Sequence, residues 1–179
     1  MHGLIFAGLR DYSLTRVGAQ ETARIWGEHD YLLTEAYDDD EFRARLEEVR
    51  KATGDSAPDL ERAFGVFAAT TTFAGLYPDY YAENDDTLEF LLGIKEQIHE
   101  LVRGTIRGAR PPSLHVRPFG KAGVLVSYTS DRRLCSMLAG LVEGVASHYG
   151  DAVEIEQIQC MLLDDPGCVF TVVRAPETR

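Results

Sequence analysis

The segment from Leu114 to Tyr128, Leu-His-Val-Arg-Pro-Phe-Gly-Lys-Ala-Gly-Val-Leu-Val-Ser-Tyr, decides the fold class. Its hydrophobic pattern has a period of two, so Leu114–Phe119 and Val124–Tyr128 are predicted to be strands. The four residues between them, Gly120–Gly123, are typical of a tight turn. Pro111-Pro112 stands just before the first strand, where a helix cannot continue. The segment therefore predicts a β-hairpin that follows a helical region.

The sequence after Tyr128 adds a helix and two more strands. Residues Arg132–Tyr149 carry an apolar stripe at helical spacing, and Gly150 ends the run. Val153–Met161 and Val169–Val173 predict strands, because the Asp164-Asp-Pro-Gly167 sequence between them favours a turn. We therefore expect a four-stranded antiparallel sheet with an inserted helix.

The first half of the chain shows helical periodicity instead. Helices are predicted over Asp11–Trp26, from the acidic stretch at Asp38 to Thr53, from Pro58 to about Phe73, and over Asp86–Arg103. Leu76–Asn84 holds three tyrosines and a proline, and we expect a loop or short turn there. The predicted fold class is α+β. The chain is predicted to be one domain over residues 1–179, with a helical part of about 1–110 and a helix-plus-sheet part of about 111–175.

Charge and composition exclude several classes of function. The 179 residues include 18 basic and 29 acidic side chains, for a formal net charge of −11. This balance argues against a nucleic acid or an anionic membrane as partner, because both are bound by excess Lys and Arg. Apolar runs are too short for a membrane span, and the N-terminus lacks the pattern of a signal peptide. We expect a cytoplasmic protein.

His99 is the candidate metal ligand of the Asp86–Arg103 segment. At about 100° per residue, it falls on a broad apolar face that includes Leu88 and Leu92. A neutral imidazole on such a face can ligate a haem iron while the apolar side chains pack against the porphyrin. The alternative is a hydrogen-bonded core histidine, which is the commoner role of a lone histidine on an apolar face.

Several short motifs accompany His99 in a fixed order. They are an M-x-G-x-I start at Met1–Ile5, Gly108-Ala-Arg-Pro-Pro112, the YxSxR pattern of Tyr128–Arg132, Gly140-Leu-Val-Glu-Gly144, and Cys160 followed by Cys168-Val-Phe. This order and spacing resembles the haem nitric-oxide/oxygen binding (H-NOX) family, which also supplies the sensor domain of soluble guanylate cyclases. The resemblance covers essentially the whole chain. It implies haem between the helical part and the sheet part.

The resemblance implies a role for each matching residue. His99 stands where the family has its proximal haem ligand, so b-type haem would be held without a covalent tether. Tyr128, Ser130 and Arg132 match the residues that bind the haem propionates, and hydroxyls with a guanidinium suit carboxylates. Pro112 matches a proline that presses on the porphyrin and bends it. Taken alone, the YxSxR pattern also fits a strand end with a surface arginine.

The positions expected opposite His99 indicate which gas binds. Oxygen-binding members that resemble this chain place a tyrosine nine residues after the tyrosine of the motif, and here that position is Met137, which has no O–H to donate. Other positions that match the pocket lining are also apolar, namely Ile5, Leu9, Phe73 and Leu141. This set favours NO, with CO as a laboratory ligand, over stable O₂ binding. A tyrosine of the Leu76–Asn84 segment, such as Tyr77, Tyr80 or Tyr81, is the alternative source of a donor.

Three cysteines form a second candidate site. In a subset of H-NOX proteins, cysteines spaced as Cys135, Cys160 and Cys168 bind structural zinc together with a fourth Cys or His. Here the fourth position is Gln157, which is a poor zinc ligand. Three thiolates with water or with His148 are one alternative, and three small buried thiols are another.

The sequence therefore predicts a stand-alone haem-based gas sensor that binds nitric oxide and CO at ferrous haem b. By family analogy it would signal to a separate effector, either a histidine kinase or a cyclic-di-GMP enzyme. An enzyme is not expected, because no nucleophile–base pair, phosphate loop or paired-carboxylate site stands out. Two alternatives stay open. One is a cysteine or zinc redox-responsive switch on the same scaffold, and the other is a small-molecule-binding domain that holds no haem in the cell.

Overall fold

The computed structural model describes residues 1–94 and 110–176. The first half is helical and comprises α1 (Gly3–Trp26), α2 (Asp39–Thr53), α3 (Ala57–Phe67), the π-helix η1 (Ala68–Phe73), α4 (Ala74–Leu76), α5 (Pro78–Ala82) and α6 (Thr87–Ile94). The second half comprises β1 (Ser113–Phe119), β2 (Gly123–Thr129), α8 (Cys135–Tyr149), β3 (Val153–Gln159), the 3₁₀ turn η3 (Met161–Leu163) and β4 (Cys168–Arg174). The α+β class is confirmed.

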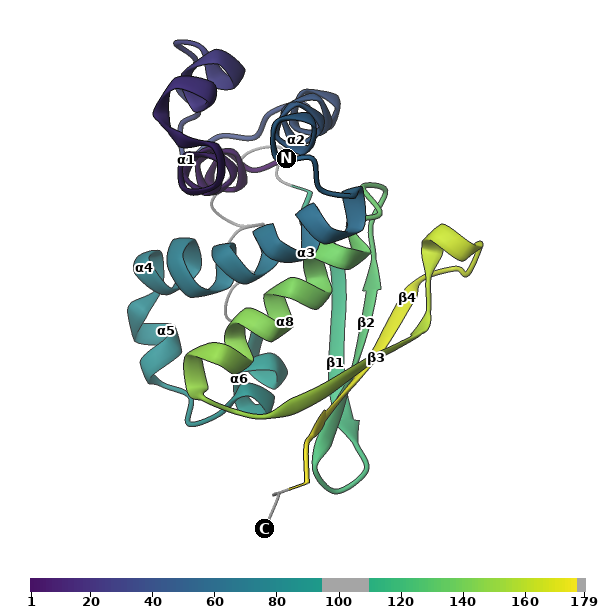
Figure 1. Cartoon of the computed structure of the whole chain (residues 1–179). Coiled ribbons are helices and arrows are strands. Elements are labelled where there is room, and N and C mark those ends of the chain that lie inside the picture. Colours follow the sequence, from purple (N-terminus) through teal and green to yellow (C-terminus); the bar gives the residue numbers. More distant parts are fainter. Residues whose placement is uncertain (95–109, 177–179) are drawn as a thin grey trace.

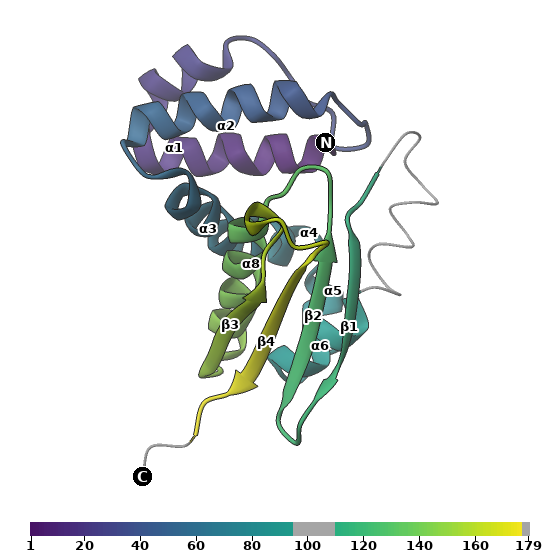
Figure 2. The same ribbon diagram turned by 90° about the vertical axis from the view of Figure 1, so that its right-hand side faces the viewer.

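The sheet has the predicted antiparallel pairing. Its strand order is β1-β2-β4-β3, and every neighbouring pair is antiparallel. The β1–β2 hairpin closes from Ser113 opposite Thr129 to Phe119 opposite Gly123. The helix α8 connects β2 to β3. Figures 1 and 2 show α3–α6 and α8 on one face of the sheet, with α1 and α2 forming a further layer beyond α3.

Helix ends follow the local sequence closely at α2. Asp38 caps its N-terminus, acidic residues occupy its first turn, and Gly54 ends it with a φ of 77°. The helix α1 begins at Gly3 rather than at Asp11, because the apolar residues before Asp11 are themselves helical and buried. It is interrupted at Gly18, where φ is 79°.

Three further predicted boundaries are wrong. The Leu76–Asn84 segment contains α5, which starts with Pro78 at its first position, where the missing N–H costs no bond. The inserted helix starts at Cys135 rather than Arg132. The strand β3 ends at Gln159, because the Cys160 N–H donates to Asp165 Oδ2 over 2.7 Å instead of to a strand partner.

Close packing of α3 on α8 explains the glycines of the Gly140–Gly144 motif. A Cβ on Gly140 would overlap the Arg62 carbonyl oxygen, and a Cβ on Gly65 would overlap the Met137 carbonyl oxygen. The two backbones therefore approach more closely than side chains would permit. An Arg62–Glu143 ion pair lies beside this contact, with Nε and Oε1 2.9 Å apart.

The buried apolar residues form two cores. One lies between the sheet, α6 and α8, and the other lies among α1, α2 and α3. Phe73 and Leu141 pack against both cores, so they mark the boundary between them. Across the described residues, no helix combines the length and apolar character needed to cross a membrane.

Candidate functional site

A cavity of about 440 Å³ lies at the boundary between the two cores. Its walls come from the start of α1, from η1, from α6, from the strands β1 and β2, and from α8. Most of the lining is apolar, including Leu91 and Ile94 of α6 and Val142 and Val145 of α8. A volume of this size suits a small molecule or a cofactor.

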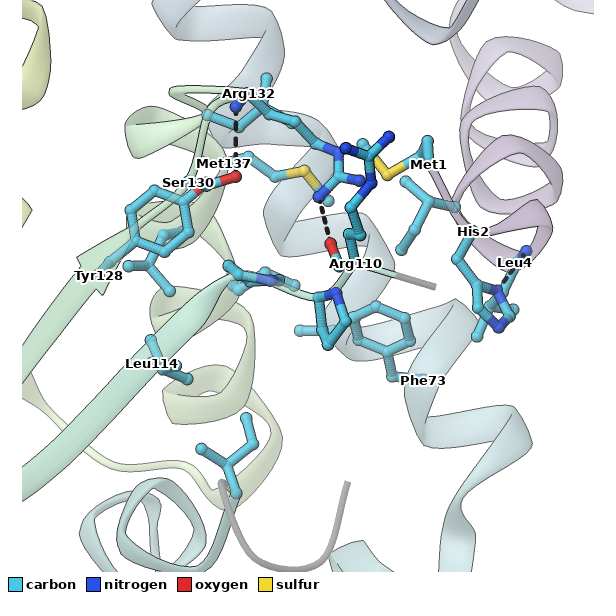
Figure 3. Close-up of a pocket in the computed structure, with 18 of the residues that line it drawn as sticks. Met1, His2, Leu4, Phe73, Arg110, Leu114, Tyr128, Ser130, Arg132 and Met137 are labelled. Atoms are coloured by element: carbon cyan, nitrogen blue, oxygen red, sulfur yellow. Dashed lines mark hydrogen bonds between the residues drawn. The ribbon is translucent and has the colours of Figure 1, made fainter. Parts of the chain in front are cut away.

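One edge of the cavity is polar, and Arg132 is its central group (Figure 3). Arg132 Nε donates to Asp39 Oδ1 over 2.8 Å, and Nη1 donates to the Arg110 carbonyl oxygen over 2.7 Å. The N-terminal ammonium of Met1 donates to the same Asp39 oxygen over 2.6 Å. Two cationic groups therefore meet at one carboxylate on the cavity rim.

The pKa of Asp39 reflects this arrangement. Partial burial on its own raises the pKa of this carboxyl. The hydrogen bonds from the Met1 ammonium and from Arg132 outweigh that effect, so the pKa of Asp39 lies below its ordinary value of 3.8. Asp39 is thus ionised at neutral pH and holds both cations in place.

Tyr128 and Ser130 join Arg132 on this edge. Tyr128 is buried at the end of β2, and Ser130 follows in the turn, where its Oγ accepts a hydrogen bond from the Arg132 N–H over 3.2 Å. Burial raises the pKa of Tyr128, so its hydroxyl keeps the proton at neutral pH. The three residues of the YxSxR pattern line the same cavity, and all three can donate hydrogen bonds to an anionic group.

The other residues proposed for the site divide into three groups. Pro112, Ile5, Phe73, Met137 and Leu141 all line the cavity. Leu9 does not, because its side chain is fully buried in the core among α1, α2 and α3. His99 lies outside the described residues, so its role as iron ligand remains a prediction.

The cavity also contains residues that the sequence did not indicate. Phe90 and Leu91 belong to its wall, as do His2 and Asp39. The acidic stretch around Asp39 indicates only the start of a helix, and nothing local in the sequence shows that it faces Arg132.

The hydroxyls of Tyr80 and Tyr81 already donate hydrogen bonds to backbone carbonyl oxygens. Tyr80 donates to the Phe90 carbonyl oxygen and Tyr81 donates to the Ala69 carbonyl oxygen, each over 2.8 Å. Burial raises the pKa of both tyrosines, which keeps them as donors. Tyr77 lines the cavity as well and is the remaining tyrosine of this segment that could face a ligand.

Comparison with known protein families identifies the family of the chain that forms this cavity. The family model described as Haem-NO-binding matches residues 2–157. The chain belongs to the H-NOX family. A comparison with curated protein sequences finds no match.

Solved H-NOX structures share the fold of this H-NOX chain. One from Shewanella oneidensis in the Fe(II)NO ligation state has a TM-score of 0.90 and 23% identity, covering 98% of this chain and 100% of that chain. The H-NOX domain from the same organism in the Fe(II)CO ligation state has a TM-score of 0.86 and 24% identity. The match covers 99% of this chain and 100% of that chain. An Fe(II) unliganded H-NOX protein from K. algicida has a TM-score of 0.82 and 21% identity. The match covers 100% of this chain and 99% of that chain. At these identities the likeness establishes the fold.

The residues of the H-NOX cavity fit a haem. Its long apolar walls suit a porphyrin, and the donors of Tyr128, Ser130 and Arg132 at one edge suit carboxylates. A polar ligand edge and an apolar ligand body are therefore both accommodated.

The three cysteines also meet in space. Their sulfur atoms lie within 4.8 Å of one another, and Cys135 Sγ is 2.7 Å from Cys168 Sγ. The β2–β4 pairing places Cys168 opposite Tyr128, so the cluster lies behind the polar edge of the cavity. Burial is the largest cause of a raised pKa at Cys135, which keeps that thiol protonated.

These cysteines do not complete a closed zinc site with the residues that the structure describes. Such a site takes four Cys or His ligands. Gln157 is exposed, and its Nε2 donates to the Gln159 carbonyl oxygen over 3.1 Å. His148 lies at the opposite end of α8 from Cys135, about 20 Å away at about 1.5 Å per residue. Within residues 1–94 and 110–176, the cluster therefore offers three thiols and no fourth ligand.

Proposed function

We propose that this chain is a haem-based gas sensor that binds NO and CO at ferrous b-type haem and signals to a separate effector protein. The observation that carries the proposal is the cavity of an H-NOX chain with Arg132, Ser130 and Tyr128 grouped on one edge. Haem supplies the ferrous iron that binds the gas. The solved relatives in NO and CO ligation states support the choice of ligands.

Different residues of the chain would bind different parts of the haem. Arg132, with its Nε and Nη1 already oriented by Asp39 and the Arg110 carbonyl, would hold the propionates together with Tyr128 and Ser130. Pro112 would press on the porphyrin from the end of the loop before β1. His99 would supply the imidazole nitrogen that holds the haem iron, an assignment that rests on its position in the sequence.

The apolar wall favours NO over oxygen. Met137, Ile5 and Phe73 line the cavity and offer no hydrogen-bond donor. Bound oxygen gains from such a donor, whereas NO binds strongly without one. Since Tyr80 and Tyr81 already donate to backbone carbonyls, Tyr77 is the candidate that would change this conclusion.

The output would pass through the helices that meet at the cavity. Residues of α1, α6 and α8 line the same cavity, so a change in the position of the bound group would act on all three. By family analogy, a histidine kinase or a cyclic-di-GMP enzyme would read that change. The domain as a whole, residues 1–179, would serve as sensor without catalytic activity of its own.

An absorption spectrum of the reduced full chain tests the function directly. We expect a ferrous haem spectrum that changes on adding NO and on adding CO, and that shows no persistent oxygenated form in air. Purified chain that takes up no haem on reconstitution would contradict the proposal and would favour a small-molecule-binding domain.

His99→Gly tests the proposed iron ligand. We expect the variant to fold but to lose ordinary haem binding, and to regain it when free imidazole fills the space of the missing side chain. His29→Gly, at an exposed position, is the matched control. An unchanged haem content and spectrum in His99→Gly would remove His99 from this role.

A second candidate function is favoured by the 2.7 Å approach of Cys135 Sγ to Cys168 Sγ. In a thiol switch, these two thiols would form a disulfide and release two protons and two electrons to an oxidant such as hydrogen peroxide, which is reduced to two waters. The buried and protonated state of Cys135 makes this reaction slow, because the thiolate is the reactive form. Haem would then be a structural cofactor.

A further inference from the structure

The first turn of α8 receives a hydrogen-bond acceptor from another helix. The N-cap residue of α8 is Leu134, whose side chain cannot cap, and the first hydrogen bond within the helix runs from the Leu138 N–H to the Leu134 carbonyl oxygen over 3.2 Å. The Met137 N–H therefore has no partner within α8. It donates instead to the carboxylate of Glu61 on α3. A negative group also suits this end of the helix dipole.

Met137 meets α3 through its carbonyl group as well. A Cβ on Gly65 would overlap the Met137 carbonyl oxygen, so the backbone of α3 lies directly against that oxygen. Glu61 and Gly65 are four residues apart and share one face of α3, which runs alongside α8 (Figure 1). The Met137 side chain is buried and lines the cavity. The same face of α3 thus fixes the backbone that carries this cavity side chain.

Glu61 is a partly buried acid whose charge state is balanced. It follows Leu60, which is fully buried. Burial raises the pKa of Glu61 to about 7, and the hydrogen bond from the Met137 N–H opposes this only in part. Both the ionised and the neutral carboxyl are therefore populated near neutral pH. The ionised form holds the Met137 N–H more strongly, because charge-assisted hydrogen bonds are the stronger ones.

Other charged side chains of the described residues do not contribute to the pKa of Glu61, which is set by burial and by the Met137 N–H. Charged groups of α3 and of the helices packed against it form pairs of their own, including Arg62 with Glu143, Arg16 with Asp55 and Arg50 with Glu47. Tyr12 of α1 and Cys135 of α8 keep their protons, because burial raises the pKa of both. Glu61 is therefore the carboxyl of this helix contact that we expect to change charge near pH 7.

We propose that Glu61 is a positioning residue for Met137. Its ionised carboxylate holds the first turn of α8, and its protonation weakens that hold and lets the Met137 side chain shift in the cavity. The inference rests on the proposed function, in which Met137 lies on the gas-binding side of the haem. Gas binding would then depend on pH near neutrality through a residue that is itself outside the cavity lining.

Nuclear magnetic resonance of the full, haem-free chain tests the contact itself. In the parent, the ¹H and ¹⁵N shifts of the Met137 amide should titrate with a midpoint near pH 7. Glu61→Gln keeps an acceptor oxygen but has no proton to lose, so it should abolish this titration. Glu143→Gln is the matched control, because Glu143 pairs with Arg62 at the same helix contact, and it should titrate like the parent. A Met137 amide that does not titrate in the parent, or that still titrates in Glu61→Gln, would overturn the inference.

The melting temperature shows whether the carboxyl is buried as described. Because the pKa of Glu61 is raised in the folded chain, the stability it contributes is present below its ordinary value of 4.5 and is lost as the pH rises to about 7. The haem-free parent should therefore lose stability relative to Glu61→Gln between pH 5 and pH 7, and the difference should level off above pH 7. A variant that melts below the parent at pH 8 would contradict the burial of this charge and would overturn the inference.

Infrared spectra of the ferrous CO complex test the effect on the bound gas. The CO stretching frequency of the parent and of Glu143→Gln should differ between pH 6 and pH 8, whereas that of Glu61→Gln should be the same at both. A frequency that is independent of pH in the parent, or equally dependent on pH in Glu61→Gln, would overturn the inference. Failure of the parent to bind haem would instead contradict the proposed function, and the Met137 amide titration would still decide the role of Glu61.

Discussion

Arg132 Nε donates to Asp39 Oδ1 over 2.8 Å, although the two residues are 93 positions apart in the sequence. The contact joins the turn after β2 to the first residue of α2, and so it connects the sheet half of the molecule to the outer helical layer. Because the Met1 ammonium shares the same carboxylate oxygen, Asp39 also fixes the start of the chain. One carboxylate thus organises the polar edge of the cavity.

The first prediction concerns acid stability. The pKa of Asp39 is lower in the folded chain than its ordinary value of 3.8, so its contribution to stability is present above that value and is lost as the pH falls through the folded pKa. We expect Asp39→Asn to destabilise the haem-free chain by about 1 kcal/mol at pH 6. The difference from the parent should shrink as the pH falls below 3.8. Thermal unfolding followed by circular dichroism at pH 6 and at a series of lower pH values measures it.

Asp40→Asn is the matched control for Asp39. Asp40 is the next residue of α2 and forms an exposed ion pair with Arg43. Its replacement should change the free energy of unfolding by less than that of Asp39. Equal effects of the two substitutions would show that the contact with Arg132 is not the source of the stability.

The second prediction concerns haem retention. Arg132→Ala should release haem faster by about 10- to 150-fold, because a hydrogen bond to a charged group contributes about 1.5–3 kcal/mol. The neighbouring Arg133 is exposed, so Arg133→Gln should release haem at the parental rate. Transfer of haem to apomyoglobin gives both rates. Equal retention in the Arg132→Ala variant would show that the propionates are anchored elsewhere.

The sequence predicted the sheet well because strands with a period of two and turn-forming residues are local signals. The hairpin of β1 and β2 and the antiparallel pair of β3 and β4 followed from the alternating strand segments and the turns between them. The pairing of β2 with β4 was not predicted. The Asp39–Arg132 contact left no such signal, because it depends on how two distant segments meet. The short helix α5 was missed for a related reason, since five residues show less than two helical turns.

The site was likewise predicted in part. The family motifs placed Tyr128, Ser130, Arg132, Pro112 and Met137 on the cavity wall, whereas Leu9 belongs to the outer core. An apolar residue on a helix looks the same in sequence whether it faces a cofactor or another helix. Only tertiary packing separates these two cases, and that is also why His2 was not recognised as a cavity residue.

The third prediction concerns the contact between α3 and α8. Gly140→Ala would place a Cβ on the Arg62 carbonyl oxygen, which cannot move without shifting α3. We expect a loss of about 1–3 kcal/mol in the free energy of unfolding, measured by urea denaturation. Gly75→Ala is the control, because a Cβ at Gly75 would have no atom within 4 Å and alanine favours the helix. Similar effects at both sites would argue against close helix packing.

The fourth prediction concerns the thiols. Cys160 is partly exposed, whereas Cys135 and Cys168 are buried and Cys135 is held protonated. In the native, haem-free chain we expect Cys160 to react first with an aromatic disulfide reagent, with the other two reacting only on the timescale of unfolding. Mass spectrometry of the partly labelled chain identifies the site. Rapid labelling of Cys135 at neutral pH would favour the redox-switch function.

The last prediction joins the apolar wall to gas selectivity. Met137 is buried, lines the cavity and has no donor, so the ferrous parent should form no persistent oxygen complex in air. Met137→Tyr adds a phenol at this position. One hydrogen bond of about 1–3 kcal/mol corresponds to about 5- to 150-fold in affinity, which should make an oxygenated absorption spectrum detectable.

Met137→Phe is the control that isolates the hydroxyl. It introduces a ring of nearly the same size, so any change caused by filling the cavity should appear in both variants, whereas oxygen binding should appear only with tyrosine. If the parent itself shows a persistent oxygenated spectrum, the apolar-wall argument is wrong. Tyr77→Phe would then be the variant to measure, because Tyr80 and Tyr81 already donate to the carbonyl oxygens of Phe90 and Ala69 while Tyr77 shares the cavity wall.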